Sequence, residues 1–543
     1  MSKSDSNIKG TQKNTLAGYG KYLRFTLKHS LVRYIVWIGI IVFLIAYVGV
    51  YYKAIFKDPA ALRDFQATVA TPGLVSMVGK VSALAIANAA LCSAVWAKIW
   101  MFSALTLGIG MVFQITKGVR ADEENGRTEI FRSRPFGIHS TLAAVVSGAL
   151  ILCAVIGILS AVSLHLLDLD PDNNTMTGPI AFGLSVMAVG WLGVGIGALS
   201  NQLSASSSIA NSTGSIILAI FYIMRMMGDL GTNDTLTWIS PLGWAQKMAP
   251  WGENRFWLLI PNVILTAVLI MAAFVIEARR DYGSGVLKDK TGHPDASPLK
   301  RHTWGLILHL YKGSIIGWTI GVAIFGLLFG SVVNTMMSML KDMNVPFLDA
   351  SSMDSMVGFM MCFIGLVSVL LPMLIMIGLR TDETKGLMEA QLAGSVSRYN
   401  MVLERYVIGI ITAVFLLVLG GATFGLSFGV ANDDISQIGK LALDALIYLP
   451  GIMAITSVTV LLFGFIPRAT IPVTWFIYGL MYFAVLLIDQ NKTPKGVIYL
   501  FPFLGTPKIP GASFDPIVIV YLTVAILFVA VGMFGLRKRD VPR

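Results

Sequence analysis

About twelve stretches of this chain are apolar over roughly 20 consecutive residues, the length that crosses the hydrocarbon core of a bilayer as an α-helix. The stretches are continuous and rich in Leu, Ile, Met and Gly. They therefore lack the ~10-residue alternation of polar and apolar side chains that marks a membrane β-barrel. Only 13% of the 543 residues are charged, whereas soluble chains carry about 25%. The sequence predicts an all-α polytopic membrane protein.

We expect six spans in each half of the chain. The first six lie near residues 34–52, 96–115, 140–164, 179–199, 212–227 and 256–277. The second six lie near residues 313–333, 357–379, 402–428, 442–465, 469–488 and 514–536. A further apolar stretch, 81–95, either extends the second span or forms a re-entrant or surface segment.

The polar and basic residues 1–33 precede the first span. Within them Leu23 and Leu27 recur at helical spacing, while Lys21, Arg24 and Lys28 share another face. This pattern predicts an amphipathic helix on the membrane surface. Most of the 41 Lys and Arg residues lie on the same side as the N-terminus when the spans alternate, as cytoplasmic segments do. We therefore expect both termini in the cytoplasm, with the basic charge facing anionic lipid rather than nucleic acid.

An internal repeat underlies the two sets of spans. The chain reads GVRADEENGRTE at 118–129, just after span 2, and GLRTDETKGLME at 378–389, just after span 8. Both halves also end alike, with Arg279, Arg280 and Asp281 after span 6 and Lys538, Arg539 and Asp540 after span 12. A constant offset of about 260 residues predicts two parallel six-helix repeats. The expected divisions are an N-terminal segment 1–33, a first half 34–278, a cytoplasmic linker 279–303 and a second half 304–543.

The repeated acidic segment is the candidate functional site. If it is helical, Asp122, Gly126 and Glu129 lie on one face. Acidic residues in an inside loop run against the basic preference of such loops, so a soluble partner with a basic groove is expected to face them. The alternative is a solvated helix whose acidic first turn suits the helix dipole, which is a weaker explanation for two copies in equivalent loops. The candidate contact residues are Asp122, Glu123, Glu124, Gly126, Glu129, Asp382, Glu383, Gly386 and Glu389.

The string ADEENGRTEIFRSRPF at 121–136 resembles the acidic segment of type-2 ABC exporter permeases. RRDYGSGVLKDKTG at 279–292 and YKGSIIGW at 311–318 match further signatures of the fused, two-half subfamily that exports polyketide antibiotics and other drugs. The resemblance covers nearly the whole chain. It implies a bacterial plasma-membrane permease with a role in antibiotic resistance, whose acidic segments are coupling helices. In the second copy Lys385 and Leu387 replace Asn125 and Arg127, so the two docking contacts need not be equivalent.

The resemblance also implies that ATP and Mg are bound by a separate ATP-binding subunit, present in two copies. A phosphate-binding loop needs four residues between its glycines and a Ser or Thr after its lysine. The closest string here, GLVSMVGKVS at 73–82, has five residues between the glycines, and Val81 follows Lys80. We therefore expect a non-catalytic transport subunit with no cofactor or metal of its own. Its expected partners are the ATP-binding subunits, lipid and a hydrophobic small molecule, but no nucleic acid.

A proton-coupled secondary carrier is the competing interpretation, because such carriers also have twelve spans in two parallel halves. Their loop after span 2 holds a motif that GVRADEENGR overlays only partly, since Glu123 stands in place of an Arg and Asn125 in place of a Gly. Carriers need ionisable groups within the membrane. Those available in or beside the spans are Lys98, Arg225, Asp444, Glu404 and Arg405. Asp444 is the first candidate for a proton-binding group.

Met and Phe residues are frequent in spans 2, 5 and 8, where the resemblance places the substrate path. A flexible wall of Met and aromatic side chains suits amphipathic molecules of varied shape. The alternative is that these residues serve helix packing and lipid contact. The candidate path residues are Met101, Phe102, Met111, Phe113, Phe221, Met224, Met361 and Phe363.

Overall fold

The computed structural model describes residues 15–57, 59–70, 72–132, 136–170, 175–204, 206–231, 234–280, 285–286, 302–341, 353–393, 397–487, 493–510 and 513–539. Its regular elements in these ranges are all helices, which confirms the expected all-α fold. The chain divides into two compact units, unit 1 (Met1–Thr291) and unit 2 (Gly292–Arg543).

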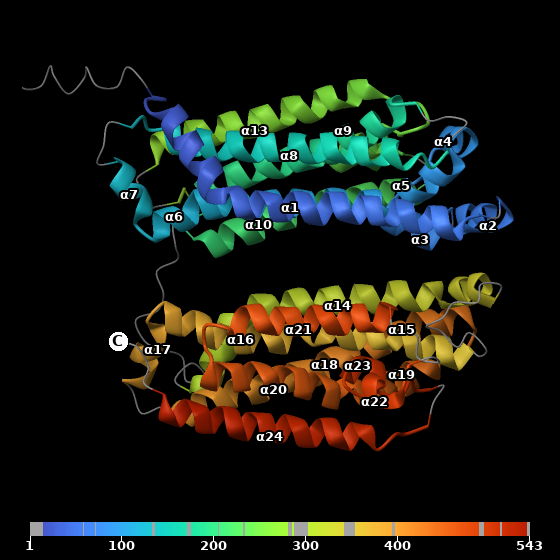
Figure 1. Ribbon diagram of the computed structural model, residues 1–543, viewed down its shortest axis with the longest axis vertical. Helices are drawn as coiled ribbons and strands as arrows, with labels where there is room; N and C mark the ends of the chain where they lie inside the picture. Colours follow the sequence, from blue (N-terminus) through green and yellow to red (C-terminus); the bar gives the residue numbers. More distant parts are fainter. Residues whose placement is uncertain are drawn as a thin grey trace, which may run out of the picture. The chain divides into compact units, whose positions relative to one another are not determined.

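Six long helices build unit 1 and run along its length (Figure 1). They are α1 (Tyr19–Ile55), α5 (Ala90–Gly118), α8 (Ser140–Leu167), α9 (Thr177–Leu203), α10 (Ser207–Leu230) and α13 (Leu259–Arg279). Helix α9 is the centre of the unit, because it packs on α5, α8, α10 and α13. Glycines permit this close approach. A Cβ atom on Gly193 would collide with the backbone of Gly108 on α5, and one on Gly183 with that of Gly157 on α8.

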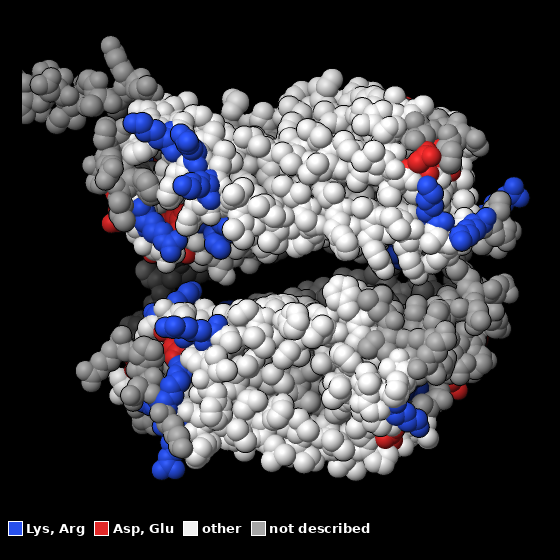
Figure 2. Space-filling model, in the orientation of Figure 1, with Lys and Arg blue, Asp and Glu red and all other residues white. Residues whose placement is uncertain are grey.

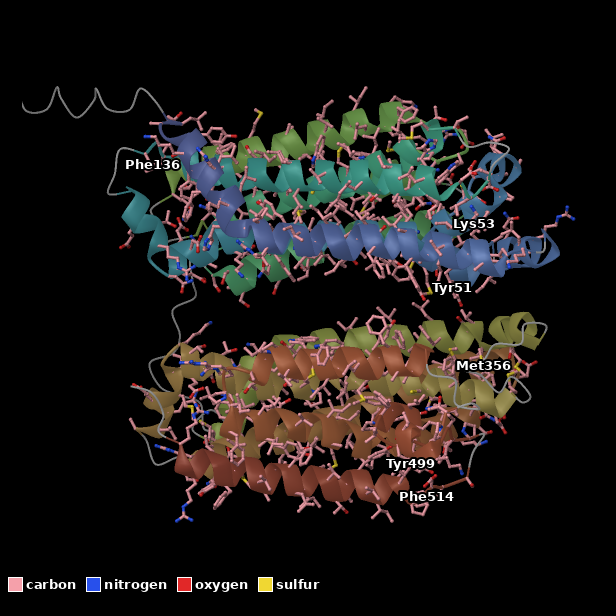
Figure 3. The ribbon with its side chains drawn as sticks, in the orientation of Figure 1. Tyr51, Lys53, Phe136, Met356, Tyr499 and Phe514 are labelled. Carbon is pink, nitrogen blue, oxygen red and sulfur yellow. The ribbon has the colours of Figure 1, made fainter. Side chains whose placement is uncertain are left out.

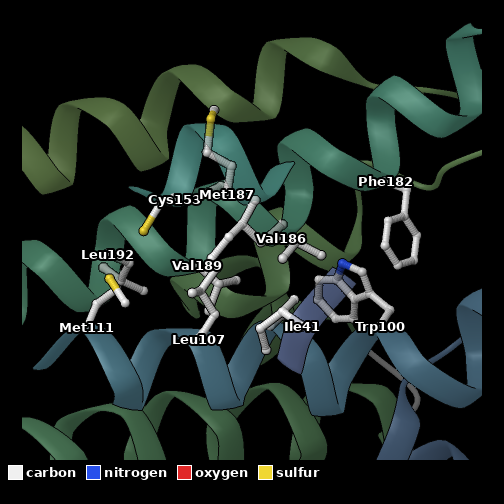
Figure 4. Packing of buried hydrophobic residues seen from close by; sticks show 14 of the residues in the cluster. Ile41, Trp100, Leu107, Met111, Cys153, Phe182, Val186, Met187, Val189 and Leu192 are labelled. Carbon is white, nitrogen blue, oxygen red and sulfur yellow. The ribbon is translucent and has the colours of Figure 1, made fainter. Parts of the chain in front are cut away.

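The core of unit 1 is filled by apolar side chains of these helices. Leu107 and Met111 of α5 lie among Val189 and Leu192 of α9, with Cys153 of α8 beside them (Figure 4). Some of the buried polar groups are paired across helices. For example, the Trp100 indole N–H donates a hydrogen bond to Ser185 Oγ at 2.7 Å. Such pairing is needed where lipid offers no hydrogen-bond partner.

Short helices lie at the two ends of unit 1. Helices α6 (Arg120–Glu124) and α7 (Arg127–Arg132) lie at one end, and α2 (Pro59–Val69), α3 (Pro72–Val78) and α4 (Ala83–Asn88) lie at the other (Figure 1). Phe136 and Lys53 mark these two ends (Figure 3). The remaining short elements are α11 (Thr235–Ile239), α12 (Pro241–Gln246) and the 3-10 helix η3 (Phe256–Leu258).

Unit 2 is built on the same plan of long helices with short helices at the ends. Its long elements are α14 (Thr303–Lys341), α15 (Met353–Ser368), α16 (Leu370–Thr384), α18 (Arg398–Ala431), α20 (Leu449–Phe465), α21 (Thr470–Leu487) and α24 (Ile517–Lys538). Its short elements are α17 (Leu387–Leu392), α19 (Gln437–Asp444), η5 (Ala445–Tyr448), α22 (Lys495–Ile498) and α23 (Pro502–Gly505). The closest helix pairs are α14 with α18 and α20 with α24.

Eleven helices of the described chain are long and apolar enough to cross a membrane. The expected span at 469–488 corresponds to α21, which contains a shorter apolar helix, Thr470–Val485, and residue 488 lies outside the described residues. The expected surface helix before the first span is not a separate element, because α1 continues unbroken from Tyr19 to Ile55. The stretch 81–95 is divided, since Ala83–Asn88 forms α4 and Ala90 begins α5.

The visible face of each unit has charged residues at its two ends and an uncharged band between them (Figure 2). Large apolar side chains are exposed in that band, among them Phe43 of α1 and Ile526 of α24. Exposed apolar patches of this extent are unfavourable in water and suit the acyl chains of a bilayer. The chain is a multi-pass membrane protein.

Candidate functional site

Each acidic segment bends at a glycine instead of forming one helix. Gly126 and Gly386 occupy equivalent positions of the two copies, and both have φ of 69°. A left-handed glycine ends a helix, so the chain turns between α6 and α7 and again between α16 and α17. The expectation that Asp122, Gly126 and Glu129 share one helical face is therefore wrong. We call residues 119–132 the first acidic loop and residues 380–392 the second acidic loop.

Glu123 of the first acidic loop is buried between two arginines. Arg120 Nη1 donates to Glu123 Oε2 at 2.5 Å, and Arg280 Nη2 donates to Glu123 Oε1 at 2.7 Å. Arg280 Nε also donates to Gln202 Oε1 at 2.6 Å. These four residues form what we call the first clamp. It joins the loop after span 2 to the ends of α9 and α13, which are spans 4 and 6 of the unit.

Glu383 of the second acidic loop has the same arrangement. Arg380 Nη1 donates to Glu383 Oε2 at 2.6 Å, and Arg539 pairs with the other carboxylate oxygen. Arg539 Nη1 also donates to the Phe463 carbonyl at 2.6 Å, and its guanidinium lies 5.1 Å from the centre of the Phe463 ring. These residues form the second clamp. It again joins the loop after the second span to the ends of spans 4 and 6, here α20 and α24.

Two other candidate acids anchor their loops differently. Glu124 accepts hydrogen bonds from the backbone N–H and the hydroxyl of Ser207, both at 2.6 Å, and so ties the first acidic loop to the start of α10. Asp382 pairs with Arg405 of α18 and ties the second acidic loop to that helix. Neither contact is repeated in the other unit. Thr384 stands 260 residues after Glu124 and has no carboxylate, and Val145 stands 260 residues before Arg405 and has no guanidinium. The two loops thus share one anchor and differ in the other.

The remaining candidate acids lie at the surface of the loops. Asp122 pairs with the exposed Arg127 at 3.2 Å. Glu129 and Glu389 are exposed, and no ion pair reaches either from the part of the chain that the structure describes. They are therefore accessible to another molecule.

The arginines and glutamine that complete the anchors were not among the predicted site residues. A signal for Arg280 and Arg539 was present, since both halves end in a basic pair followed by Asp. Gln202 and Arg405 carry no comparable signal, because the positions 260 residues away hold Leu462 and Val145 and the repeat therefore does not mark them. Their roles follow from packing that brings distant segments together.

The candidate path residues differ in their exposure. Met101, Met111 and Met361 are core residues, whereas Phe102 and Phe113 are exposed on α5. Phe221 and Met224 of α10 and Phe363 of α15 are half-buried. Met101 and Phe102 share a cavity of about 150 Å³ with Tyr222 of α10 and Met77 of α3. The assignment of a substrate path to these residues remains a prediction.

Two of the five ionisable groups in or beside the spans, Arg225 and Arg405, form ion pairs. Arg225 is buried, pairs with Asp229 at 3.2 Å and donates to the Ser76 carbonyl at 2.8 Å. Asp229 was not among the predicted ionisable groups of the spans, because α10 extends beyond the expected end of its span. Arg405 belongs to the anchor of the second acidic loop, while Lys98 is exposed and Glu404 and Asp444 are half-buried. Asp444 Oδ2 lacks a hydrogen-bond partner among the described residues.

A polar pocket of about 230 Å³ lies at the end of unit 1 opposite its acidic loop. Lys80, Lys247 and Asp234 line it, with both lysines paired to the aspartate. The hydrogen bond from Lys247 lowers the pKa of Asp234. The whole lining holds three basic residues, Lys80, Lys247 and Arg255, and three acidic ones, Asp229, Asp234 and Glu253, so it has no net charge that would favour a charged ligand.

Comparison with known proteins finds similarity to multidrug efflux permeases. Residues 301–537 match the family model described as "Multidrug efflux system permease Rv1217c, C-terminal domain". The multidrug efflux system permease protein Rv1217c of Mycobacterium tuberculosis is 29% identical over 463 residues, which cover 82% of this chain and 82% of that protein. The similar stretch is longer than either unit, so it includes parts of both. The expected resemblance to exporter permeases is thus confirmed, and this chain is similar over most of its length to a multidrug efflux system permease.

Proposed function

We propose that this chain is the membrane permease of an ATP-driven ABC exporter that moves hydrophobic or amphipathic small molecules out of the cell. ATP is hydrolysed by a separate ATP-binding subunit, two copies of which dock on the first and second acidic loops. Closure of the two subunits moves both loops, and the loops move the spans. A cavity that is open to the cytoplasm or the inner leaflet then releases its substrate outward.

The observation that carries this proposal is the duplicated acidic loop. Both copies turn at a glycine with φ of 69° and present an exposed glutamate just after the turn, Glu129 or Glu389. A helical bundle that only crosses the membrane has no need for the same acidic turn in two equivalent loops. The similarity to a multidrug efflux permease supports a small-molecule substrate, and the abundance of Met and Phe suits such substrates.

The exposed glutamates provide the test of docking. Glu129→Lys with Glu389→Lys should reduce ethidium-stimulated ATPase activity of the complex at least tenfold, because a basic groove repels the new charges. Glu123 is unsuitable for this test, since reversing a buried, doubly paired charge perturbs folding. Asp354→Lys is the matched control, as Asp354 is exposed at the other end of unit 2. Unchanged stimulation in the double variant would contradict docking on these loops.

A proton-coupled carrier is the second candidate, favoured by the half-buried Asp444. A half-buried carboxylate with an oxygen that lacks a hydrogen-bond partner among the described residues is the kind of group that could bind a transported proton. Ethidium transport by the purified chain in vesicles, driven by a proton gradient without ATP and lost in Asp444→Asn, would establish this function. Transport that requires ATP and the partner subunit would exclude it.

A further inference from the structure

The first and second clamps tie each acidic loop to helices that are not its neighbours in sequence. The first acidic loop is covalently continuous with α5 and leads toward α8, so spans 2 and 3 feel its motion through the chain itself. Spans 4 and 6 have no such connection. They reach the loop through Gln202 and Arg280 in unit 1, and through the Phe463 carbonyl and Arg539 in unit 2.

Arginine is suited to this junction because its guanidinium binds in two directions at once. Arg280 uses Nη2 for Glu123 and Nε for Gln202, and Arg539 uses different nitrogens for Glu383 and the Phe463 carbonyl. A lysine at either position has a single ammonium group and cannot reproduce the same planar geometry. Each arginine therefore fixes both the position and the orientation of the carboxylate it holds.

Burial makes the junction stiff. In the first clamp the side chains of Arg120, Glu123 and Arg280 are 1%, 4% and 4% exposed. Separating such groups leaves charges without partners in a site that water hardly reaches, which is costly. A displacement of the loop is therefore more favourable if the end of the last span follows it than if the ion pairs break.

We propose that Arg280 and Arg539 are positioning residues that fix each acidic loop to the last span of its own unit, so that loop and span move together. This inference rests on the proposed function, because it describes how a push on the loop reaches the bundle. Glu123 and Glu383 then act inside the chain as the central members of the clamps. The surface that receives the partner is formed by other residues, Glu129 and Glu389 among them.

Hydrogen exchange on the full-length chain in detergent tests the junction without any partner. In Arg280→Gln we expect exchange in the peptide 119–132 to accelerate at least tenfold, together with faster exchange at the end of α13. Arg279→Gln is the matched control, since Arg279 is the adjacent, exposed arginine on the same helix. The proposal would be overturned if the first acidic loop of Arg280→Gln exchanges hydrogen at the same rate as in the wild type.

The complex with the ATP-binding subunit tests transmission. In Arg280→Gln the subunit should still co-purify and basal ATPase activity should stay within twofold, while stimulation by ethidium falls at least fivefold. Arg539→Gln, with exposed Arg537→Gln as its control, repeats the test at a less buried site if the first variant fails to fold. The proposal would be overturned if hydrogen exchange in the loop is accelerated in a variant but ethidium still stimulates its ATPase activity fully. If the wild-type chain does not co-purify with the ATP-binding subunit, the proposed function is contradicted instead. This result is obtained without any variant, so it is distinguishable from a failure of the clamp.

Discussion

The two acidic loops share one anchor and differ in another. The shared anchor is a feature that both halves of the repeat retain, and the second anchor is one in which the halves have diverged. Both loops hold a buried glutamate between an arginine three residues earlier and an arginine after the last span. The first loop is tied in addition to α10 through Glu124, and the second to α18 through Asp382. The shared anchor reaches spans 4 and 6 in both units. The second anchor reaches span 5 in unit 1 but span 3 in unit 2.

If a partner acts on these loops as proposed, we expect the two loops to respond differently to the same force. A push on the first loop would then be passed to the start of α10 through Glu124, and a push on the second to α18 through Asp382. The replacement of Asn125 and Arg127 by Lys385 and Leu387 also alters the outer surface of the second loop. We expect the two loops to be similar in their glycine turns and in their attachment to the last span, and unequal in their second anchors and outer surfaces.

The largest effect should come from removing the central glutamates. Glu123→Gln removes the carboxylate that pairs with Arg120 and Arg280, which are exposed by only 1% and 4%, so we expect a loss of about 3–5 kcal/mol in stability. Glu383→Gln should cost less, about 1–3 kcal/mol, because water can reach Arg380 and Arg539, which are 18% and 15% exposed. Denaturation of the full-length chain in detergent measures both. Equal losses of stability in the two variants would show that the difference in burial between the clamps does not set their strength.

Removal of the anchor found only in unit 2 should have an intermediate effect. Arg405→Gln leaves Asp382 without its ion pair, at an expected cost of about 1–3 kcal/mol. Hydrogen exchange should accelerate in the second acidic loop and stay unchanged in the first. Arg468→Gln is the control, because Arg468 is exposed. Equal acceleration in both loops would mean that Arg405 stabilises the chain globally rather than this loop.

The glycine turns should behave alike in the two loops. Gly126→Ala and Gly386→Ala each place a Cβ atom on a residue with φ of 69°, a conformation that costs L-residues about 1–2 kcal/mol. No atom of the described residues lies within 4 Å of either Cβ position, so we expect backbone strain to be the main cost. Thermal unfolding of each variant measures it, and an Asn at either position should recover part of the loss. A large difference between the two alanine variants would contradict the equivalence of the turns.

The smallest effect is expected from the anchor found only in unit 1. Ser207→Ala removes the hydroxyl that binds Glu124 but retains the backbone N–H, so about 0.5–1.5 kcal/mol should be lost. Hydrogen exchange at the first turn of α10 reports the change. Thr384→Ala, at the position equivalent to Glu124, should leave unit 2 unaffected within error.

Much of the fold could be predicted from the sequence because the bilayer restricts it so strongly. A run of apolar residues about 20 long has few alternatives to a membrane helix, so the long helices lie close to their expected positions. The error at α1 arose because the change from an amphipathic to an apolar pattern between Lys28 and Tyr34 does not require a break in the helix. The error in α10 arose because Asp229 is neutralised by Arg225 one turn earlier, which lets the helix continue.

The candidate site was predictable only in part. The repeat pointed to the right segments, and both contain the residues that matter. It did not indicate the turns at Gly126 and Gly386, because a single glycine in a helical pattern has several possible roles. Nor did it distinguish Glu123, which is buried and paired, from Glu129, which is exposed. A run of acidic residues in the sequence does not indicate which of their side chains is buried.

The sequence by itself determined that this chain is a helical membrane protein with a duplicated acidic segment, because hydropathy and repetition are properties of the order of residues. Only the tertiary structure decided what those acids do. Arg280 lies 157 residues from Glu123, and Arg539 lies 156 residues from Glu383, so neither pair is visible as a motif. Each forms because packing of the last span brings its arginine to the loop, where a buried carboxylate requires a counter-charge.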